Sequence, residues 1–528
     1  MKNGLLFGIC ATLFVVTQVD AQRLHPADLT YRGAFRLPSV SGASNWSYSG
    51  CGMTYYPQGD PSGPADGYPG SLFIIGHDQD QLVSEVSIPV PVISPTKRLS
   101  DLNTATTLQG FADITRGMFG SLEIAYSDIE YLPPQGAQTT GKLHFCWGQH
   151  FQFERAPSHG WCELNLANPQ PAGPWFFGDF TNYVSNDYLF EIPAEWAAQH
   201  TPGQRLATGR FRDGHWSGMG PALFAYGPWN DGNPPAPNTT LTAITPLLLY
   251  GENVPGIPEI VTSEDRAMKG FSPADYWSGG AWLTAGNASA LIFVGTKAIG
   301  RSWYGYSDGT VYPDDPPYPP TPPFPHDQRG WWSEGIRARI IFFDPNDLVL
   351  VAAGSMQTWE PQPYDSMDID QYLFDPGFDY PRYKNRSLGA VAFDRERRLL
   401  YIVERMADED ERSLIHVFHV SATSDVQEAG VRDMDFRLVQ VFPNPTSSGT
   451  TISFRAAQTT QVRLEIYNLV GQRIRVLLNE AVVPGEHTIF WDGRDAQGMD
   501  VPSGIYVCRM ASGTWRDSRK AIFIRPRN

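Results

Sequence analysis

The chain repeats one pattern of apolar runs, and this repetition constrains its fold more than any other feature. Cys51–Pro89 contains a glycine-led strand (CGMTYYP), a nearly all-apolar strand (SLFIIGHD) and an alternating strand (VSEVSIP). Leu388–Val420 repeats these parts as LGAVAFD, RLLYIVER and SLIHVFHV. A strand that is apolar on both faces must be covered on both sides, whereas an alternating strand has one wet face. Antiparallel sheets repeated radially around an axis satisfy both demands, so we predict an all-β fold containing a β-propeller.

The number of repeats depends on where the first strand of each unit begins. A turn of the type aromatic-Ser-Gly precedes several apolar runs, with its serine at positions 49, 217, 278 and 333. Even spacing of such turns would allow seven blades. Pairs of a first and a second strand indicate five, which begin near residues 50, 127, 217, 278 and 388. We therefore predict five blades with large insertions, with six or seven as alternatives. The early strand Leu29–Pro38 should complete the last blade and remove the exposed edges.

The first residues have the pattern of a secretory signal. Lys2 supplies a positive charge, Leu5–Val16 an apolar core and Val19–Ala21 a small-residue cleavage site. The apolar run is shorter than the ~20 residues that a membrane-spanning helix needs. We expect a signal peptide at 1–22, the propeller at 23–420, a polar linker at 421–435 and a secreted product.

The charge balance argues against nucleic acid and anionic membranes as partners. The formal net charge is −16, and both partners need a basic surface. The 50 glycines, 44 prolines and 13% aromatic residues suit many short strands joined by turns. The proline-rich run Tyr312–Pro325 must be a loop, and we expect a stiff excursion at the surface.

A change of texture at Phe436 marks a second domain, 436–528. Short alternating strands follow one another there, which is the pattern of an immunoglobulin-like β-sandwich. FPNP at Phe442–Pro445, YNLVGQ at Tyr467–Gln472 and the run Gly485–Met510 resemble the C-terminal sorting domain of type IX secretion cargo; the last run also resembles the FlgD-like immunoglobulin domain. The resemblance implies that outer-membrane secretion machinery recognises this tail. It also implies that the protein reaches the cell surface or the medium.

The ends of the strands collect the candidate site residues. In an antiparallel sheet the first strand starts at the end where the second strand stops, so these positions should share one face around an axial depression suited to a ligand. Aromatic faces stack on sugar rings and arginine pairs with carboxylates, which points to polysaccharide. Each residue also has a structural interpretation, as a turn or a packing group. The catalytic candidates are His77, Asp78, His215 and Tyr304, and the substrate-binding candidates are Trp216, Trp277, Arg301 and Trp303.

His and Cys side chains concentrate in one segment. His144 and Cys146 share a face of the expected strand and could bind one ion with His150, but the spacing matches no standard zinc pattern. An exported protein can form disulfides, and Cys146 and Cys162 are close in sequence. We predict this disulfide, which would remove both thiolates from the ion. No cofactor is expected, with a structural metal ion as the alternative.

Three classes of function fit these observations. The sequence favours the first, a propeller that binds and acts on polysaccharide as a hydrolase or lyase, and the other two are alternatives. A lyase would use His215 and Tyr304 as base and acid, with Arg301 neutralising a uronate. A hydrolase would need paired carboxylates at the starts of the inner strands. The first inner strand begins Gly50-Cys51-Gly52 and has no acidic residue there. The second is a non-catalytic glycan-binding or adhesion propeller, which the repeated aromatic turns favour. The third is a structural surface protein.

Overall fold

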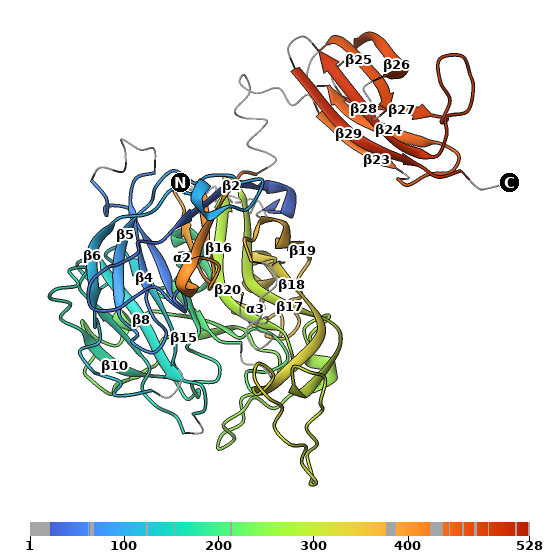
Figure 1. The fold of residues 1–528 in the computed structure, drawn as a ribbon. Helices are drawn as coiled ribbons and strands as arrows, with labels where there is room; N and C mark the ends of the chain where they lie inside the picture. Colours follow the sequence, from blue (N-terminus) through green and yellow to red (C-terminus); the bar gives the residue numbers. More distant parts are fainter. Residues whose placement is uncertain are drawn as a thin grey trace, which may run out of the picture. The chain divides into compact units, whose positions relative to one another are not determined.

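The computed structural model describes residues 22–422, apart from 62, 64–67, 123–124, 153, 212–213 and 376–386, and residues 437–525, apart from 443, 457–458, 469–471, 484 and 513–514 (Figure 1). The chain forms two compact units, residues 1–425 and 426–528. Nearly all of the expected signal peptide and linker lies outside the described residues. In the described part of the chain, no helix has the length and apolar character that crossing a membrane requires.

The described residues of the first unit form five sheets, each of which runs back and forth through four strands in antiparallel order. Sheet one contains β3 (Met53–Tyr56), β4 (Ser71–Ile75), β5 (Val83–Ser87) and β6 (Thr107–Ala112). Sheet two contains β7 (Ala125–Leu132), β8 (Lys142–Gln149), β9 (His159–Cys162) and β10 (Ala172–Phe177), with β14 (Thr240–Leu241) added in parallel. Sheet three contains β11 (Tyr188–Glu191), β12 (Leu206–Gly209), β13 (Leu223–Tyr226) and β15 (Ile244–Leu248).

Sheets four and five complete the unit. Sheet four contains β16 (Tyr276–Ala285), β17 (Ala288–Tyr306), β18 (Arg329–Phe343) and β19 (Asp365–Asp368), with β1 (Gln22–Arg23) parallel to β17. Sheet five contains β20 (Leu388–Asp394), β21 (Leu399–Glu404), β22 (Leu414–Val420) and β2 (Leu29–Arg36). Two short α-helices, α2 (Ala194–His200) and α3 (Pro345–Ala352), lie in connections between strands.

The first strands of the five sheets contact one another in cyclic order. β3 lies beside β7, β7 beside β11, β11 beside β16, β16 beside β20, and β20 again beside β3. Hydrogen bonds join some of these neighbours directly: the Ala390 N–H donates to Gly50 O (2.9 Å), and the Ser278 hydroxyl donates to Leu388 O (2.8 Å). Since the first strand of each sheet is the one that meets its neighbours, the starts of these strands gather at one end of the ring.

The early strand closes sheet five, as predicted. β2 pairs with β22 in antiparallel register from Leu29 opposite Val420 to Arg36 opposite Leu414. The outermost strand of this sheet therefore comes from the beginning of the chain and the other three from residues 388–420. This pairing joins distant segments of the first unit and covers an edge of β22 that would otherwise be open.

The expected start of a first strand near residue 217 is wrong. The first strand of sheet three is β11, and His215–Pro228 leads instead into β13, the third strand. Both strands are short and almost entirely buried, so their apolar patterns do not distinguish an inner from a middle position. Alternate strands of an antiparallel sheet run in the same direction, so the start of β13 still faces the end of the ring where β11 starts.

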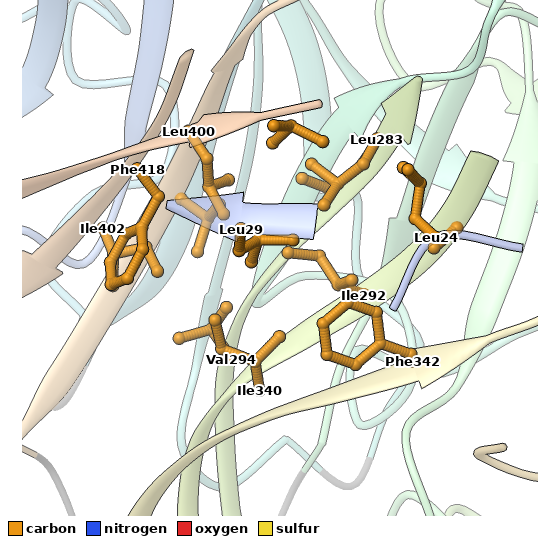
Figure 2. Close-up of a cluster of buried hydrophobic side chains, with 14 of the residues drawn as sticks. Leu24, Leu29, Leu283, Ile292, Val294, Ile340, Phe342, Leu400, Ile402 and Phe418 are labelled. Atoms are coloured by element: carbon orange, nitrogen blue, oxygen red, sulfur yellow. The ribbon is translucent and has the colours of Figure 1, made fainter. Parts of the chain in front are cut away.

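Buried side chains fill the space between neighbouring sheets. Between sheets four and five, Ile292, Val294 and Phe342 face Leu400 and Phe418 (Figure 2). Leu24 and Leu29, from the beginning of the described chain, complete the same cluster, and both are fully or almost fully buried. Strands apolar on both faces are thus covered on both sides, as the sequence pattern requires.

The second unit is a β-sandwich. One sheet contains β23 (Arg437–Phe442), β24 (Thr450–Ala456) and β27 (Gly485–Trp491); the other contains β26 (Arg473–Val482), β25 (Thr460–Asn468), β28 (Gly504–Ser512) and β29 (Trp515–Phe523). Trp491 and Phe454 from one sheet pack with Ile466 and Cys508 from the other. Gly493 and Gly498 have φ of 70° and 80°, in the positive range that glycine adopts readily in tight turns.

Candidate binding site

The expected meeting of strand starts and strand ends occurs at several points of the ring. Arg405, just after β21, donates to the backbone oxygens of Tyr48 (2.7 Å) and Ser49 (3.2 Å), which precede β3. Lys297 in β17 forms an ion pair with Asp275, just before β16, at 2.6 Å. These contacts place side chains from different parts of the sequence at one end of the sheets.

Asp128 in β7 is a buried carboxylate that joins three first strands. Its Oδ1 accepts the N–H groups of Ile129 (2.8 Å) and of Met53 at the start of β3 (3.0 Å). Its Oδ2 accepts the N–H of Leu189 in β11 (2.8 Å). Burial raises the pKa of Asp128 well above its usual range. These three hydrogen bonds all come from backbone N–H groups, so we assign Asp128 a structural role.

Glu130 repeats this arrangement two residues further along β7. Its Oε2 accepts the Thr54 hydroxyl (2.7 Å), and its Oε1 accepts the N–H of Glu191 in β11 (3.0 Å). Burial raises the pKa of Glu130 to about 8. The two carboxylates of β7 thus hold neighbouring strands together, and their hydrogen bonds do not favour the paired-carboxylate chemistry of a hydrolase.

His77 and Asp78 lie together in the connection between β4 and β5. The His77 ring meets Tyr48 edge-on with centroids 5.6 Å apart, and His77 Nδ1 accepts the N–H of Gln79 (3.2 Å). Asp78 Oδ2 lies 3.4 Å from Arg405 Nη2. These contacts belong to a turn and to its attachment to sheet five. Among the described residues, no contact joins this pair to His215 or Tyr304.

The three weak metal candidates do not converge. His144 is buried and its Nε2 lies 2.8 Å from Gln138 Oε1, while the His150 ring stacks on Tyr126 with centroids 5.6 Å apart. Burial lowers the pKa of His144 to about 3. Within the described ranges, no group of three or more His, Cys, Asp or Glu side chains could hold a metal ion.

The predicted Cys146–Cys162 disulfide is wrong. Both thiols are free. In the antiparallel register of β8 and β9, Cys146 lies opposite His159, and Cys162 lies opposite Leu143. The two cysteines also belong to different buried clusters, so their side chains point to opposite sides of the sheet. Nearness in sequence could not reveal this register.

Trp277 and Trp216 differ in what they offer a ligand. Trp277 is fully buried among the apolar side chains between sheets three and four, so its predicted role as a ligand-stacking residue is wrong. Trp216 is half-buried, and its ring lies 5.0 Å from that of Tyr183 and 6.2 Å from the exposed Phe151. Only Trp216 of the two has a ring edge that solvent reaches.

The hairpin of β17 and β18 extends well beyond the rest of sheet four. β16 pairs with β17 only as far as Thr296, and β19 pairs with β18 only as far back as Arg339. Beyond these points the two strands continue as a ribbon to Tyr306 and Arg329, and the connection 307–328 packs back on its end. This ribbon carries three of the eight candidate residues from the sequence. They are Arg301, Trp303 and Tyr304.

One side of this ribbon forms a cluster of aromatic rings around an arginine, which we call the arm face. Tyr304 lies opposite Trp331 in the β17–β18 register, with ring centroids 5.7 Å apart. The guanidinium carbon of Arg329 lies 4.4 Å from the ring centroid of Tyr312 and 5.7 Å from that of Tyr304. Tyr318 stacks on Tyr312 at 4.9 Å and is 51% exposed. The arm face consists of Tyr304, Tyr312, Tyr318, Arg329 and Trp331.

His215 borders the arm face. Its ring lies 6.2 Å from Trp331 and 5.2 Å from Phe271. Its φ of 73° is unusual for a residue with a side chain, so the turn before β13 holds this ring at a fixed position. Burial lowers the pKa of His215, so the ring is mainly neutral near pH 7. The structure therefore brings two of the four catalytic candidates, His215 and Tyr304, to the same tryptophan.

Arg301 and Trp303 make a separate pair. The Arg301 guanidinium lies 5.4 Å from the Trp303 ring centroid and 3.8 Å from Glu334. The Trp303 indole N–H donates to Tyr306 O (2.9 Å). Since successive strand residues point to opposite faces, Trp303 and Tyr304 lie on opposite sides of the ribbon.

The arm-face residues Trp331, Arg329, Tyr312 and Tyr318 were not among the sequence candidates. Two signals were present: the adjacent tryptophans in RGWWSEGIRARI, and the tyrosines within the proline-rich run. Neither signal predicts that the two segments lie side by side. They do so because the connection 307–328 folds back onto the ribbon, where the Tyr312 N–H donates to Tyr304 O (2.9 Å).

Comparison with known proteins gives one family match. Residues 443–514 match the family model of the FlgD Ig-like domain, which agrees with the resemblance found in the tail. No curated protein matches the chain. The second unit therefore contains a recognised domain type.

Similar solved structures include two proteins of Porphyromonas gingivalis. Dimeric latent PorU is 17% identical over 24% of this chain and 12% of its own, with a TM-score of 0.17. PorZ, described as an essential bacterial surface component of the type-IX secretion system, is 13% identical over 92% of this chain and 54% of its own, with a TM-score of 0.29. A fructosyltransferase from A. japonicus is 9% identical over 96% and 92%, with a TM-score of 0.26. These scores are too low to support an argument about this chain.

Proposed function

We propose that this protein is exported by the type IX route to the cell surface or the medium, and that its first unit, a five-bladed β-propeller, binds polysaccharide on the arm face. The single observation that carries the binding role is the cluster of partly exposed aromatic rings on the arm face, with an arginine between two of them. Contiguous exposed rings on a soluble protein mark an interaction site.

The cyclic contacts of the five first strands support the propeller. A ring of antiparallel sheets leaves only short, protected edges, and β2 closes the last sheet. The contacts of β20 with β3 also agree with five blades rather than six or seven, because among the described residues these two first strands are direct neighbours.

The C-terminal unit supports the export route. Its sandwich core, its turn glycines and its match to the FlgD Ig-like domain agree with the sorting-domain motifs of the sequence. We propose that secretion machinery at the outer membrane recognises this unit and that the first unit is the cargo.

Binding fits the geometry better than acid–base catalysis. His215 has aromatic rings as its ring neighbours, and Trp331 lies between it and Tyr304. A base and an acid acting on one bond must both reach the reacting atoms of a single sugar, whereas stacking needs only ring faces. We therefore favour the non-catalytic glycan-binding propeller over the hydrolase or lyase.

The test is a glycan-binding screen of the purified mature protein, with Tyr304→Ala and Trp331→Ala as the variants. Each variant should lose binding to the glycans that the wild-type protein binds, because the substitution removes an aromatic ring on which sugars stack. Phe490→Ala is the matched control: this ring is 62% exposed but lies in the second unit, so binding should not change. Wild-type protein that binds no glycan, or Tyr304 and Trp331 variants that bind normally, would reject the proposal.

A further inference from the structure

Arg329 distinguishes the arm face from a purely aromatic surface. Its side chain is exposed, and its guanidinium lies between the rings of Tyr304 and Tyr312. Among the described residues, no hydrogen bond or ion pair within 4.0 Å involves this guanidinium. A charged group held in position but without a carboxylate partner is available to a ligand.

The two tyrosine rings attract the Arg329 guanidinium without using its hydrogen-bond donors. The Tyr304 and Tyr312 rings are nearly perpendicular to each other (86°), and the guanidinium carbon lies within cation–π distance of both centroids. The N–H donors lie in the plane of the guanidinium, and they match the two oxygens of a carboxylate as a fork. Since these donors have no hydrogen-bond partner among the described residues, they are available to a ligand.

Arg301 is the informative contrast on the same ribbon. It also lies over an aromatic ring, that of Trp303, but Glu334 is 3.8 Å away and neutralises part of its charge. Arg329 keeps an unneutralised positive charge on the surface of a chain whose net charge is −16. The complementary ligand for this charge is an anion that also has faces for the tyrosine and tryptophan rings.

We infer that the arm face binds an acidic polysaccharide, in which Arg329 pairs with the carboxylate of a uronic acid while Tyr304, Trp331 and Tyr318 contact the sugar rings. This inference rests on the proposed glycan-binding function and specifies its substrate class. Arg329 selects for the charge of the polymer, and the rings provide affinity that does not depend on charge.

The experiment compares binding of the mature protein to polygalacturonate, to its fully methyl-esterified form and to dextran sulfate, which carries sulfates but no carboxylate. The wild type should bind polygalacturonate most tightly, with an affinity that falls as salt is added. Arg329→Gln should weaken polygalacturonate binding by about tenfold or more, since a charge-assisted hydrogen bond is lost, and should leave binding to the methyl ester unchanged. Arg301→Gln is the matched control and should change neither.

Each other outcome has a defined meaning. Equal wild-type affinity for the acid and its methyl ester, or Arg329→Gln that binds like the wild type, would overturn the acidic specificity while the glycan-binding function stands. A preference for dextran sulfate over polygalacturonate would replace the carboxylate by a sulfate and also overturn the inference. Absence of binding to all three polymers and to the wider glycan screen would overturn both proposals. Unchanged thermal unfolding of both arginine variants checks that the exposed substitutions leave the fold intact.

Discussion

Asp128 Oδ2 accepts the backbone N–H of Leu189 at 2.8 Å, although the two residues lie in different sheets and are 61 positions apart. The same carboxylate accepts the N–H of Met53, so one side chain ties the first strands of sheets one, two and three together. Backbone pairing within a sheet cannot provide this link, because the first strands of neighbouring sheets are not paired by ladder hydrogen bonds. Asp128 therefore has a structural role that no apolar residue could replace.

Replacement of Asp128 by Asn should destabilise the first unit. The Asn side chain has a single acceptor oxygen, and its NH₂ group would face one of the buried N–H donors. An unsatisfied buried donor costs about 1–3 kcal/mol, and Asp128→Ala should cost more because all three N–H groups lose their acceptor. Urea unfolding measures the change, with the exposed Glu195→Gln as the control. Wild-type stability of both Asp128 variants would show that the carboxylate does not hold the strands.

Glu130 should make the first unit less stable as the pH rises. Its pKa is about 8 in the folded protein against an ordinary value of 4.5, so between these values the folded state binds more protons than the unfolded state. Stability linked to this group is therefore fully present below pH 4.5 and is lost as the pH rises through 8. Glu130→Gln, which resembles the protonated acid, should remove this contribution, a difference on the order of a few kcal/mol at most.

The measurement for Glu130 is the difference in unfolding free energy between wild type and Glu130→Gln at several pH values. From acidic pH to pH 8, the Glu130→Gln variant should become increasingly stable relative to the wild type. Other titrating groups contribute equally to both proteins and cancel in the difference. The nearby charges of Glu191 and Arg395 are common to the two proteins. A difference that stays constant with pH would show that Glu130 has an ordinary pKa.

Cys51, Cys146 and Cys162 should be free thiols in the mature protein, as they are in the structure. Burial raises the pKa of Cys51 to about 11, so this thiol should react slowly in the folded protein despite its partial exposure. Alkylation followed by peptide mass measurement should label these three thiols in denaturant without a reductant. A mass that requires prior reduction for full labelling would contradict the structure.

The sequence was informative wherever local patterning decides the structure. Four of the five expected starts, near residues 50, 127, 278 and 388, fall at β3, β7, β16 and β20, and the early strand β2 pairs where it was expected. These segments combine a glycine-led or polar start with an apolar run, and the repeat itself requires coverage on both faces. The alternation of the tail likewise predicted its sandwich.

The sequence did not predict features that depend on strand register or on the position of a strand within its sheet. YLFE in β11 and LFAY in β13 are equally apolar, so only the packing of whole sheets decides which one is innermost. Trp277 and Trp332 each precede a serine in similar sequences, WSGG and WSEG, yet Trp277 is fully buried between sheets and Trp332 is half-buried on the ribbon beyond them. The extent of that ribbon depends on where β16 and β19 stop pairing, which no local pattern states.

Removal of the acidic residues beside the arm face should strengthen binding of an acidic polysaccharide. Asp314 and Asp315 are exposed and follow Tyr312 after a single proline, Pro313, so their charges oppose that of a bound uronate. Asp314→Asn with Asp315→Asn should raise the affinity for polygalacturonate by roughly two- to fivefold at low salt, and added salt should abolish the gain. Isothermal titration at two salt concentrations measures both effects. A gain of equal size for the methyl-esterified polymer would point to a change in loop structure instead of charge.

Two neighbouring aromatic residues of the second unit should have opposite effects on export. Trp491 is fully buried, its indole N–H donates to Arg494 O (3.0 Å), and its ring packs against Tyr506 and Phe523. Trp491→Ala should cost about 3–5 kcal/mol, which is a large part of the stability of a small domain. Phe490 is 62% exposed and points away from this core, so Phe490→Ala should leave the sandwich folded.

If the secretion machinery recognises the folded sandwich, the Trp491→Ala variant should accumulate in the periplasm. The Phe490→Ala variant should reach the surface or the medium like the wild type. Immunoblots of periplasmic, surface and medium fractions with an antibody against the first unit measure this distribution. Because the antibody recognises the cargo unit, loss of the tail by proteolysis does not hide the retained protein. Normal export of Trp491→Ala would mean that a linear segment of the tail, rather than its folded core, directs the protein across the outer membrane.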